Sequence, residues 1–200
     1  MFGAIRILVA FLLFLIVFFV ILRLKNKQPK RLFIIIVVVV LLISLLGFMP
    51  FENLVYNFKS AEEVYEYYYF SEEKVELVVE GVESDFVIGK KNGARTFLIV
   101  PKTADSWRIG ISLNTKKVVH RFHNGITVNV YQYKNTSDYF VTVSYIDGGE
   151  LRVSDDYNTK FYSLKDGFLD KNFVTYYAHI TNLNPQYSVI VNDNEIVLSK

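Results

Sequence analysis

The side chains most able to do chemistry are the three histidines, His120, His123 and His179. His120 and His123 form an H-x-x-H pair, a spacing that would place both imidazoles on one face of a helix. The residues around them alternate as in a β-strand, where side chains three positions apart point to opposite faces. The sequence therefore predicts no shared metal ion at this pair, and it places His179 at the edge or surface of a strand.

Adjacent acidic residues are the next candidates, at Glu62-Glu63, Glu72-Glu73 and Asp155-Asp156. The first pair stands at a predicted helix start, where the helix dipole favours negative charge. Asp155-Asp156 falls in a predicted loop and lacks the D-x-D-x-D-G spacing of a calcium loop. We interpret it as a solvated turn, and no acidic pair has the context that would make it a catalytic dyad.

Known catalytic signatures are missing from the sequence, which contains no G-x-S-x-G, P-loop, G-x-G-x-x-G or H-E-x-x-H pattern. The chain also has no cysteine, which excludes disulfides, thiolate catalysis and thiolate metal ligands. We therefore predict no catalytic, cofactor-binding or metal-ligating residue, no cofactor, and a protein that is not an enzyme.

Charge is distributed unevenly between the first 50 residues and the rest of the chain. Residues 1–50 contain no Asp or Glu, so all 20 acidic residues lie in residues 51–200, which are mildly acidic overall. Nucleic-acid binding needs a basic face on the folded domain. The charge distribution therefore predicts no nucleic-acid partner.

The first 50 residues are dominated by two apolar runs and predict a transmembrane helical hairpin, with helices over about 2–24 and 32–49. Five basic residues lie between the runs, in residues 23–31, and the positive-inside rule places such a loop in the cytoplasm. This predicts a two-pass protein of the cell membrane with both termini and residues 51–200 extracytoplasmic. The alternatives are a signal peptide, which the absence of a cleavage pattern disfavours, and a pair of buried core helices.

Residues 51–115 predict a small α+β unit, because a helical period is followed by strand-like alternation. Ser60 and Glu63 have the spacing of a capping box, which predicts a helix from about Ala61 to Phe70. Trp107 opens a predicted strand and is expected to pack in the core. The strands predicted in this unit are Val75–Glu80, Asp85–Lys90, Thr96–Val100 and Trp107–Leu113.

Residues 116–200 predict a β-rich, sandwich-like unit of short strands with regular turn signals. Residues 155–172 read as polar and irregular. The strands predicted here are Val118–Phe122, Ile126–Tyr133, Tyr139–Ile146, Leu151–Ser154, Phe173–Ile180, Tyr187–Val191 and Glu195–Leu198. The fold class as a whole is thus a membrane-anchored α+β protein with an N-terminal transmembrane hairpin, a capped helix, an antiparallel meander and a sandwich-like end.

A tethered β-rich domain without a catalytic set is typical of a binding module. The sequence predicts a membrane-anchored extracytoplasmic binding or protein-interaction module of the bacterial cell envelope. Its expected partners are the lipid bilayer and, as an open alternative, another membrane or cell-envelope protein. A cell-envelope hydrolase and an accessory subunit of a membrane transporter or sensor are the competing hypotheses.

Overall fold

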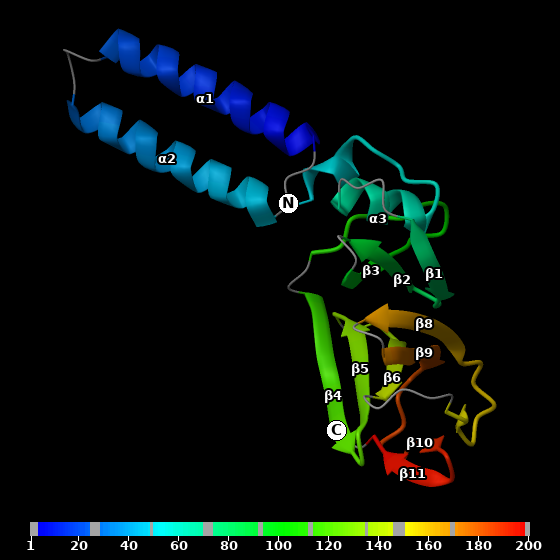
Figure 1. Cartoon of the computed structure of the whole chain (residues 1–200). Coiled ribbons are helices and arrows are strands. Elements are labelled where there is room, and N and C mark those ends of the chain that lie inside the picture. Colours follow the sequence, from blue (N-terminus) through cyan, green and yellow to red (C-terminus); the bar gives the residue numbers. More distant parts are fainter. Residues whose placement is uncertain are drawn as a thin grey trace.

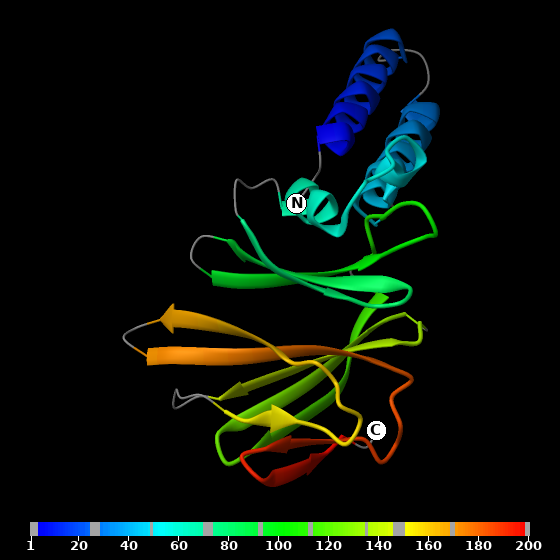
Figure 2. The same ribbon diagram turned by 90° about the vertical axis from the view of Figure 1, so that its right-hand side faces the viewer.

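The β-rich body of the protein is a stack of layers, as the computed structural model shows in Figures 1 and 2. One short helix covers a three-stranded sheet, which packs on a five-stranded sheet, which in turn packs on a small third sheet. The structure describes residues 4–24, 29–48, 50–69, 74–91, 94–111, 114–134, 136–145, 151–168 and 171–198.

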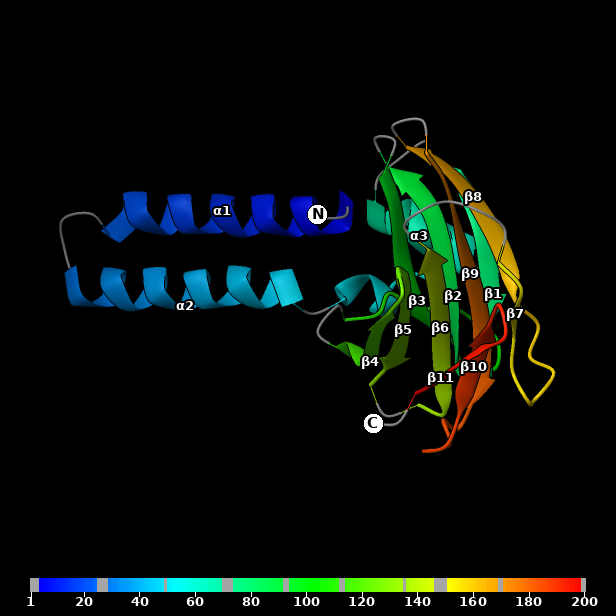
Figure 3. The same ribbon diagram turned by 60° about the horizontal axis from the view of Figure 1, so that its bottom comes forward.

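Helices α1 (Ala4–Leu24) and α2 (Pro29–Phe48) lie side by side and project from the β layers (Figures 1 and 3). Many of their apolar side chains are exposed, among them Phe19 at 66% and Phe33 at 68%. Even so, no helix in the described part of the chain combines the length and the apolar character that crossing a membrane requires.

This finding contradicts the predicted transmembrane hairpin of residues 1–50. The two-pass cell-membrane localisation and the membrane-anchored fold class depended on that hairpin, so they are wrong as well. Part of the predicted cytoplasmic loop at 23–31 lies outside the described residues. What the structure does provide at this end is a pair of adjacent helices, and the rest of the fold is mostly antiparallel sheet.

A 3-10 helix, η1 (Phe51–Leu54), and helix α3 (Ala61–Tyr69) lead into the first sheet. The predicted capping box is present in part at the start of α3, because the Glu63 carboxylate binds the amide of Lys59 instead of that of Ser60. The Glu63 amide donates to Ser60 Oγ at 3.3 Å, and the Glu63 carboxylate accepts from the Lys59 amide at 2.7 Å. These bonds satisfy amides that a helix start leaves unpaired. The helix then buries Ala61, Val64 and Tyr65 against the sheet.

The first sheet has the order β1-β2-β3, and the second, larger sheet has the order β4-β5-β6-β9-β8. All their neighbouring strands run antiparallel. A third sheet of order β11-β10-β7 closes the stack. The strands are β1 (Val75–Glu80), β2 (Ser84–Lys91), β3 (Ala94–Pro101), β4 (Thr115–His123), β5 (Ile126–Tyr133), β6 (Asp138–Tyr145), β7 (Val153–Ser154), β8 (Tyr162–Phe168), β9 (Lys171–Thr181), β10 (Ser188–Val191) and β11 (Asn194–Val197).

The five-stranded sheet is covered on both faces, and this explains the composition of β6. One face packs on the first sheet, where the rings of Phe86 and Phe140 stack with centroids 5.2 Å apart. The opposite face carries Val141 and Val143 into a core shared with Val189 and Val191 of β10. Because both faces are buried, the first six residues of β6 are all inaccessible. The run therefore contains few polar positions, as expected for a strand with two covered faces.

Two predictions of secondary structure, for residues 107–113 and 155–172, are wrong. In place of the predicted strand from Trp107 to Leu113, the described residues show isolated bridges from Trp107 to Phe58 and Lys102. Trp107 is half-buried, and its indole N–H donates to the Asp85 carboxylate at 2.5 Å. Residues 155–172, predicted to be irregular, contain strand β8. The two-unit division at residue 115 stays a prediction.

The turn between β1 and β2 predicts a sensitivity to side-chain size at Gly81. A Cβ at this position would collide with the Ser84 carbonyl oxygen and lie 2.9 Å from the Asp138 carboxylate. We expect Gly81→Ala to lower the free energy of unfolding by about 2 kcal/mol, measured by urea denaturation. Val82→Ala is the matched control, because Val82 is 62% exposed in the same turn. Equal stability of Gly81→Ala and the wild type would show that the turn is free to relax.

Candidate functional site

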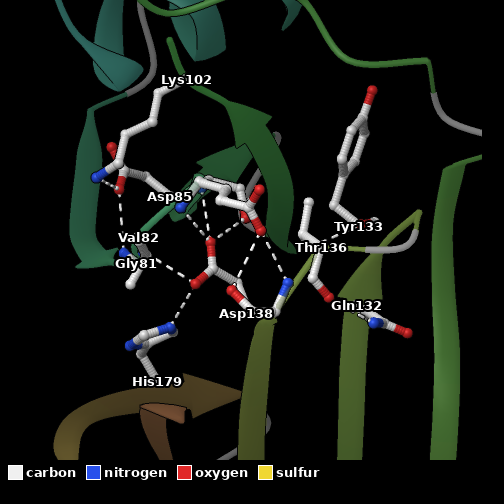
Figure 4. A network of polar contacts seen from close by, with 12 residues as sticks. Gly81, Val82, Asp85, Lys102, Gln132, Tyr133, Thr136, Asp138 and His179 are labelled. Carbon is white, nitrogen blue, oxygen red and sulfur yellow. Dashed lines mark hydrogen bonds and ion pairs between the residues drawn. The ribbon is translucent and has the colours of Figure 1, made fainter. Parts of the chain in front are cut away.

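Asp138 begins β6, and its buried carboxylate holds the β1–β2 turn of the neighbouring sheet (Figure 4). The backbone amides of Val82, Glu83 and Ser84 donate to it at 2.9, 2.7 and 2.7 Å, and Ser84 Oγ donates at 3.0 Å. Hydrogen bonds to an ionised acceptor are shorter and stronger than those between neutral groups. One carboxylate therefore fastens the first sheet to the second.

His179 supplies a fifth donor to the same carboxylate, with Nε2 2.8 Å from Asp138 Oδ1. It lies on β9 directly opposite Phe140 of β6, and the two rings are in contact. Burial would raise the pKa of Asp138, but the hydrogen bonds from His179, Val82, Glu83 and Ser84 outweigh it and hold this pKa well below its usual range. Asp138 is therefore a carboxylate, and not a carboxylic acid, at neutral pH.

Two further acidic residues reinforce this junction from the other side of the turn. The Glu83 carboxylate accepts from the Ser137 amide at 2.8 Å and from Ser137 Oγ at 3.1 Å. Asp85 accepts from the Gly81 amide at 3.1 Å and forms an ion pair with Lys102 at 2.9 Å. The turn is thus bonded to its own sheet through Asp85 and to the second sheet through Glu83 and Asp138.

A pocket of about 340 Å³ opens beside His179, at the end of β9. We call it the tyrosine pocket. It is within the size range of small-molecule sites in proteins. Among the described residues that line it there is no Lys, Arg, Asp or Glu, so these residues offer hydroxyl, amide and imidazole groups together with aromatic rings. Its lining residues are Tyr157, Thr159, His179, Ile180, Thr181, Asn182, Asn184 and Tyr187.

The wall of the tyrosine pocket is organised by Asp155, which is largely buried. Its Oδ1 accepts from the amides of Tyr157 and Thr159 at 3.0 and 2.9 Å, and its Oδ2 accepts from the Tyr187 hydroxyl at 2.6 Å. Burial, and then the hydrogen bond and charge of Asp155, raise the pKa of Tyr187 far above its usual value. Tyr187 thus stays a neutral hydrogen-bond donor at all ordinary pH values.

Tyr157 forms the exposed face of this arrangement. Its ring stacks on that of Tyr187 with centroids 5.5 Å apart and an interplanar angle of 25°, while 58% of the residue remains exposed. Asn184 Nδ2 donates to the Tyr157 hydroxyl at 3.3 Å. The ring is therefore held on one face and at its hydroxyl, and its other side is available as a flat aromatic platform.

The histidines singled out from the sequence lie in separate places. His120 contacts Asn129, and His123 contacts Asn124, both on the exposed surface of the β4–β5 hairpin. The sequence predicts His179 at the edge or surface of a strand. In the structure it lies on β9 two residues past the last position paired with β8, and its largely buried ring reaches the buried Asp138. Among the described residues, no cluster of three His, Asp or Glu side chains has the arrangement of a metal site.

The roles of Asp138 and Asp155 were not foreseen from the sequence. Asp138 directly precedes the predicted strand Tyr139–Ile146, and Asp155 belongs to the predicted solvated turn, yet both are buried acceptors. A local pattern could have indicated Asp155, because an Asp can accept from amides two and four residues further along in a turn. Asp138 had no such signal, because its partners lie more than 40 residues away.

Comparisons with protein-family models, with curated protein sequences and with solved structures found no match to this chain.

Asp138→Asn tests the junction. An amide NH₂ facing the donors of the turn would leave buried groups without an acceptor, which is strongly destabilising. We expect the free energy of unfolding to fall by about 3 kcal/mol, measured by urea denaturation at neutral pH. Asp156→Asn is the control, because Asp156 is an exposed acid in the 155–159 loop and should be unaffected. If Asp138→Asn were as stable as Asp156→Asn and the wild type, Asp138 would have no structural role.

The pH dependence of stability gives an independent prediction. The pKa of Asp138 is lowered on folding, so its contribution is complete above the unfolded pKa of about 3.9 and is lost as the pH falls through the folded pKa. The stability difference between wild type and Asp138→Asn should therefore shrink as the pH is lowered from about 4 to 2, in urea titrations of both proteins. A difference that stays constant over this range would mean that folding does not lower the pKa of Asp138.

Proposed function

We propose that the β-rich part of the chain is a binding module whose ligand is a neutral, hydroxyl-rich molecule of the carbohydrate class. The observation that carries this proposal is the tyrosine pocket, where the exposed ring of Tyr157 stands beside amide and hydroxyl side chains. Ligand pockets are commonly lined by aromatic groups with a few polar groups that fix orientation. Sugar rings present both features to a protein, with apolar C–H faces and a rim of hydroxyl groups.

The charge of the site favours a neutral ligand. A phosphate or carboxylate group would normally be met by Arg or Lys, and the lining of the tyrosine pocket contains neither. Its Asn and Thr side chains can both donate and accept hydrogen bonds, which suits hydroxyl groups that do the same. Thr181 is the last residue of β9 and Asn182 follows it directly, so the sheet positions both next to His179.

A hydrolytic function is less well supported by this geometry. Nucleophilic catalysis needs a hydroxyl or thiol in hydrogen-bond contact with its base. In the described part of the chain, the hydrogen bond recorded for His179 is to Asp138 alone, and the hydroxyl of Ser84 points to that same carboxylate. The contacts therefore support a role for Asp138 in positioning the His179 imidazole, and they do not support activation of a serine by His179.

Binding of neutral oligosaccharides by the full chain tests the proposal. Cellohexaose and chitohexaose are the probes, with decaproline as the peptide alternative because proline-rich segments also dock on aromatic grooves. Isothermal titration should detect one of the two sugars. Tyr157→Ala should weaken that binding by at least about tenfold, through loss of a stacking surface worth about 1.4 kcal/mol.

Two controls separate binding from folding. Tyr157→Phe keeps the ring and should retain most of the affinity, whereas Phe122→Ala removes an aromatic residue that is 63% exposed on β4 and should change nothing. Circular dichroism should be the same for all variants. Binding of decaproline without binding of either sugar would show that the ligand is a peptide and not a carbohydrate. If Tyr157→Ala kept the affinity of the wild type for the sugar, the sugar would bind at another site.

A further inference from the structure

A second pocket, of about 390 Å³, also has His179 in its wall. It is formed between strand β1 and the start of β8, so it belongs to the seam between the first and second sheets. Its walls include Glu80, Lys160, Tyr162 and again His179. Because His179 borders both pockets, a ligand that filled both would have to pass over its imidazole ring.

The buried carboxylate of Asp138 determines which nitrogen of His179 carries the proton. An ionised carboxylate accepts hydrogen bonds and cannot donate one. Asp138 is ionised, so the nitrogen that touches it, Nε2, must be the donor. In the neutral imidazole the lone pair then lies on Nδ1. Figure 4 shows the second ring nitrogen pointing away from Asp138.

The second pocket resembles the tyrosine pocket in aromatic content and in charge balance. The Lys160 ammonium lies over the ring of Tyr162, 4.7 Å from its centroid. Glu80 supplies one negative charge against the positive charge of Lys160. The pocket thus has no formal net charge with a neutral His179, and it offers a second aromatic ring to a neutral ligand.

We infer that the two pockets are subsites of one groove, and that His179 Nδ1 is the hydrogen-bond acceptor at its centre. The inference rests on the proposed carbohydrate-binding function and deepens it. The ligand class becomes a linear neutral oligosaccharide that is longer than one pocket. A hydroxyl or amide N–H group of that chain donates to Nδ1, and Asp138 acts as a positioning residue that keeps this acceptor available.

Chain length tests the groove with the full-length protein. Isothermal titration with the di-, tetra- and hexasaccharides of the cello- and chito-series should show affinity rising by at least about tenfold from the shortest to the longest, because the longer chain occupies both subsites. Equal affinity for all lengths would overturn the groove and leave the proposed function intact. If no sugar of either series bound, the proposed function and this inference would fall together.

His179→Gln separates the acceptor from the structural contact. Its side-chain amide nitrogen can still donate to Asp138, while its acceptor, Oε1, cannot occupy the position of Nδ1 at the same time. We expect hexasaccharide binding to weaken by about tenfold, a typical effect of one hydrogen bond in a binding site, with a urea midpoint near that of the wild type. His120→Gln is the matched control, since His120 is an exposed residue bonded to Asn129 on the far hairpin. Wild-type affinity in His179→Gln would overturn the role of Nδ1.

Nitrogen-15 NMR of the histidine side chains gives a measurement that does not depend on the stability of the protein. At mildly alkaline pH, the wild type should show His179 protonated at Nε2 and bare at Nδ1. Addition of the hexasaccharide that binds should shift the Nδ1 resonance, while the resonances of His120 and His123 stay in place. Protonation of His179 at Nδ1 instead of Nε2, or an Nδ1 chemical shift that does not change when the sugar binds, would contradict the inference.

Discussion

The buried carboxylate of Asp138 is the constraint on which the arrangement of the two larger sheets depends. Five hydrogen bonds converge on it, four from the β1–β2 turn and one from His179. A buried charge is tolerated only when its hydrogen-bonding capacity is filled. The apolar packing of Phe86 on Phe140 brings the sheets together, but apolar contact is non-directional. Asp138 fixes where the turn must sit.

The same interaction also shapes the proposed binding groove. His179 lies in the walls of two pockets because its ring is held at the seam between the sheets. A second buried acid, Asp155, plays the corresponding role for Tyr157 and Tyr187. In both places a carboxylate that is hidden from solvent orients the side chains that face it. The described residues that line the tyrosine pocket are therefore uncharged apart from the titratable His179, although a buried acid organises its wall.

Local sequence patterns predicted strands β1 and β5 with the bounds that the structure has, because alternation and turn residues are short-range signals. They failed for β8, where the alternation is weak and pairing with β9 supplies the order. The apolar runs predicted helices where the structure has α1 and α2, but their hydropathy also predicted membrane spans, which the described part of the chain contradicts. The site was not predictable, since the partners of Asp138 are distant in sequence.

Native-state hydrogen exchange of the full chain tests the role of Asp138 most directly. Val82 and Glu83 are exposed in the β1–β2 turn, where amide exchange is ordinarily fast, and the buried Ser84 is the first residue of β2. If Asp138 joins the sheets, these three amides should be protected as strongly as those of strand β6, and should lose that protection together in Asp138→Asn. Exchange in the wild type at the rate of an open loop would contradict the account, because the turn would then detach without unfolding the sheets.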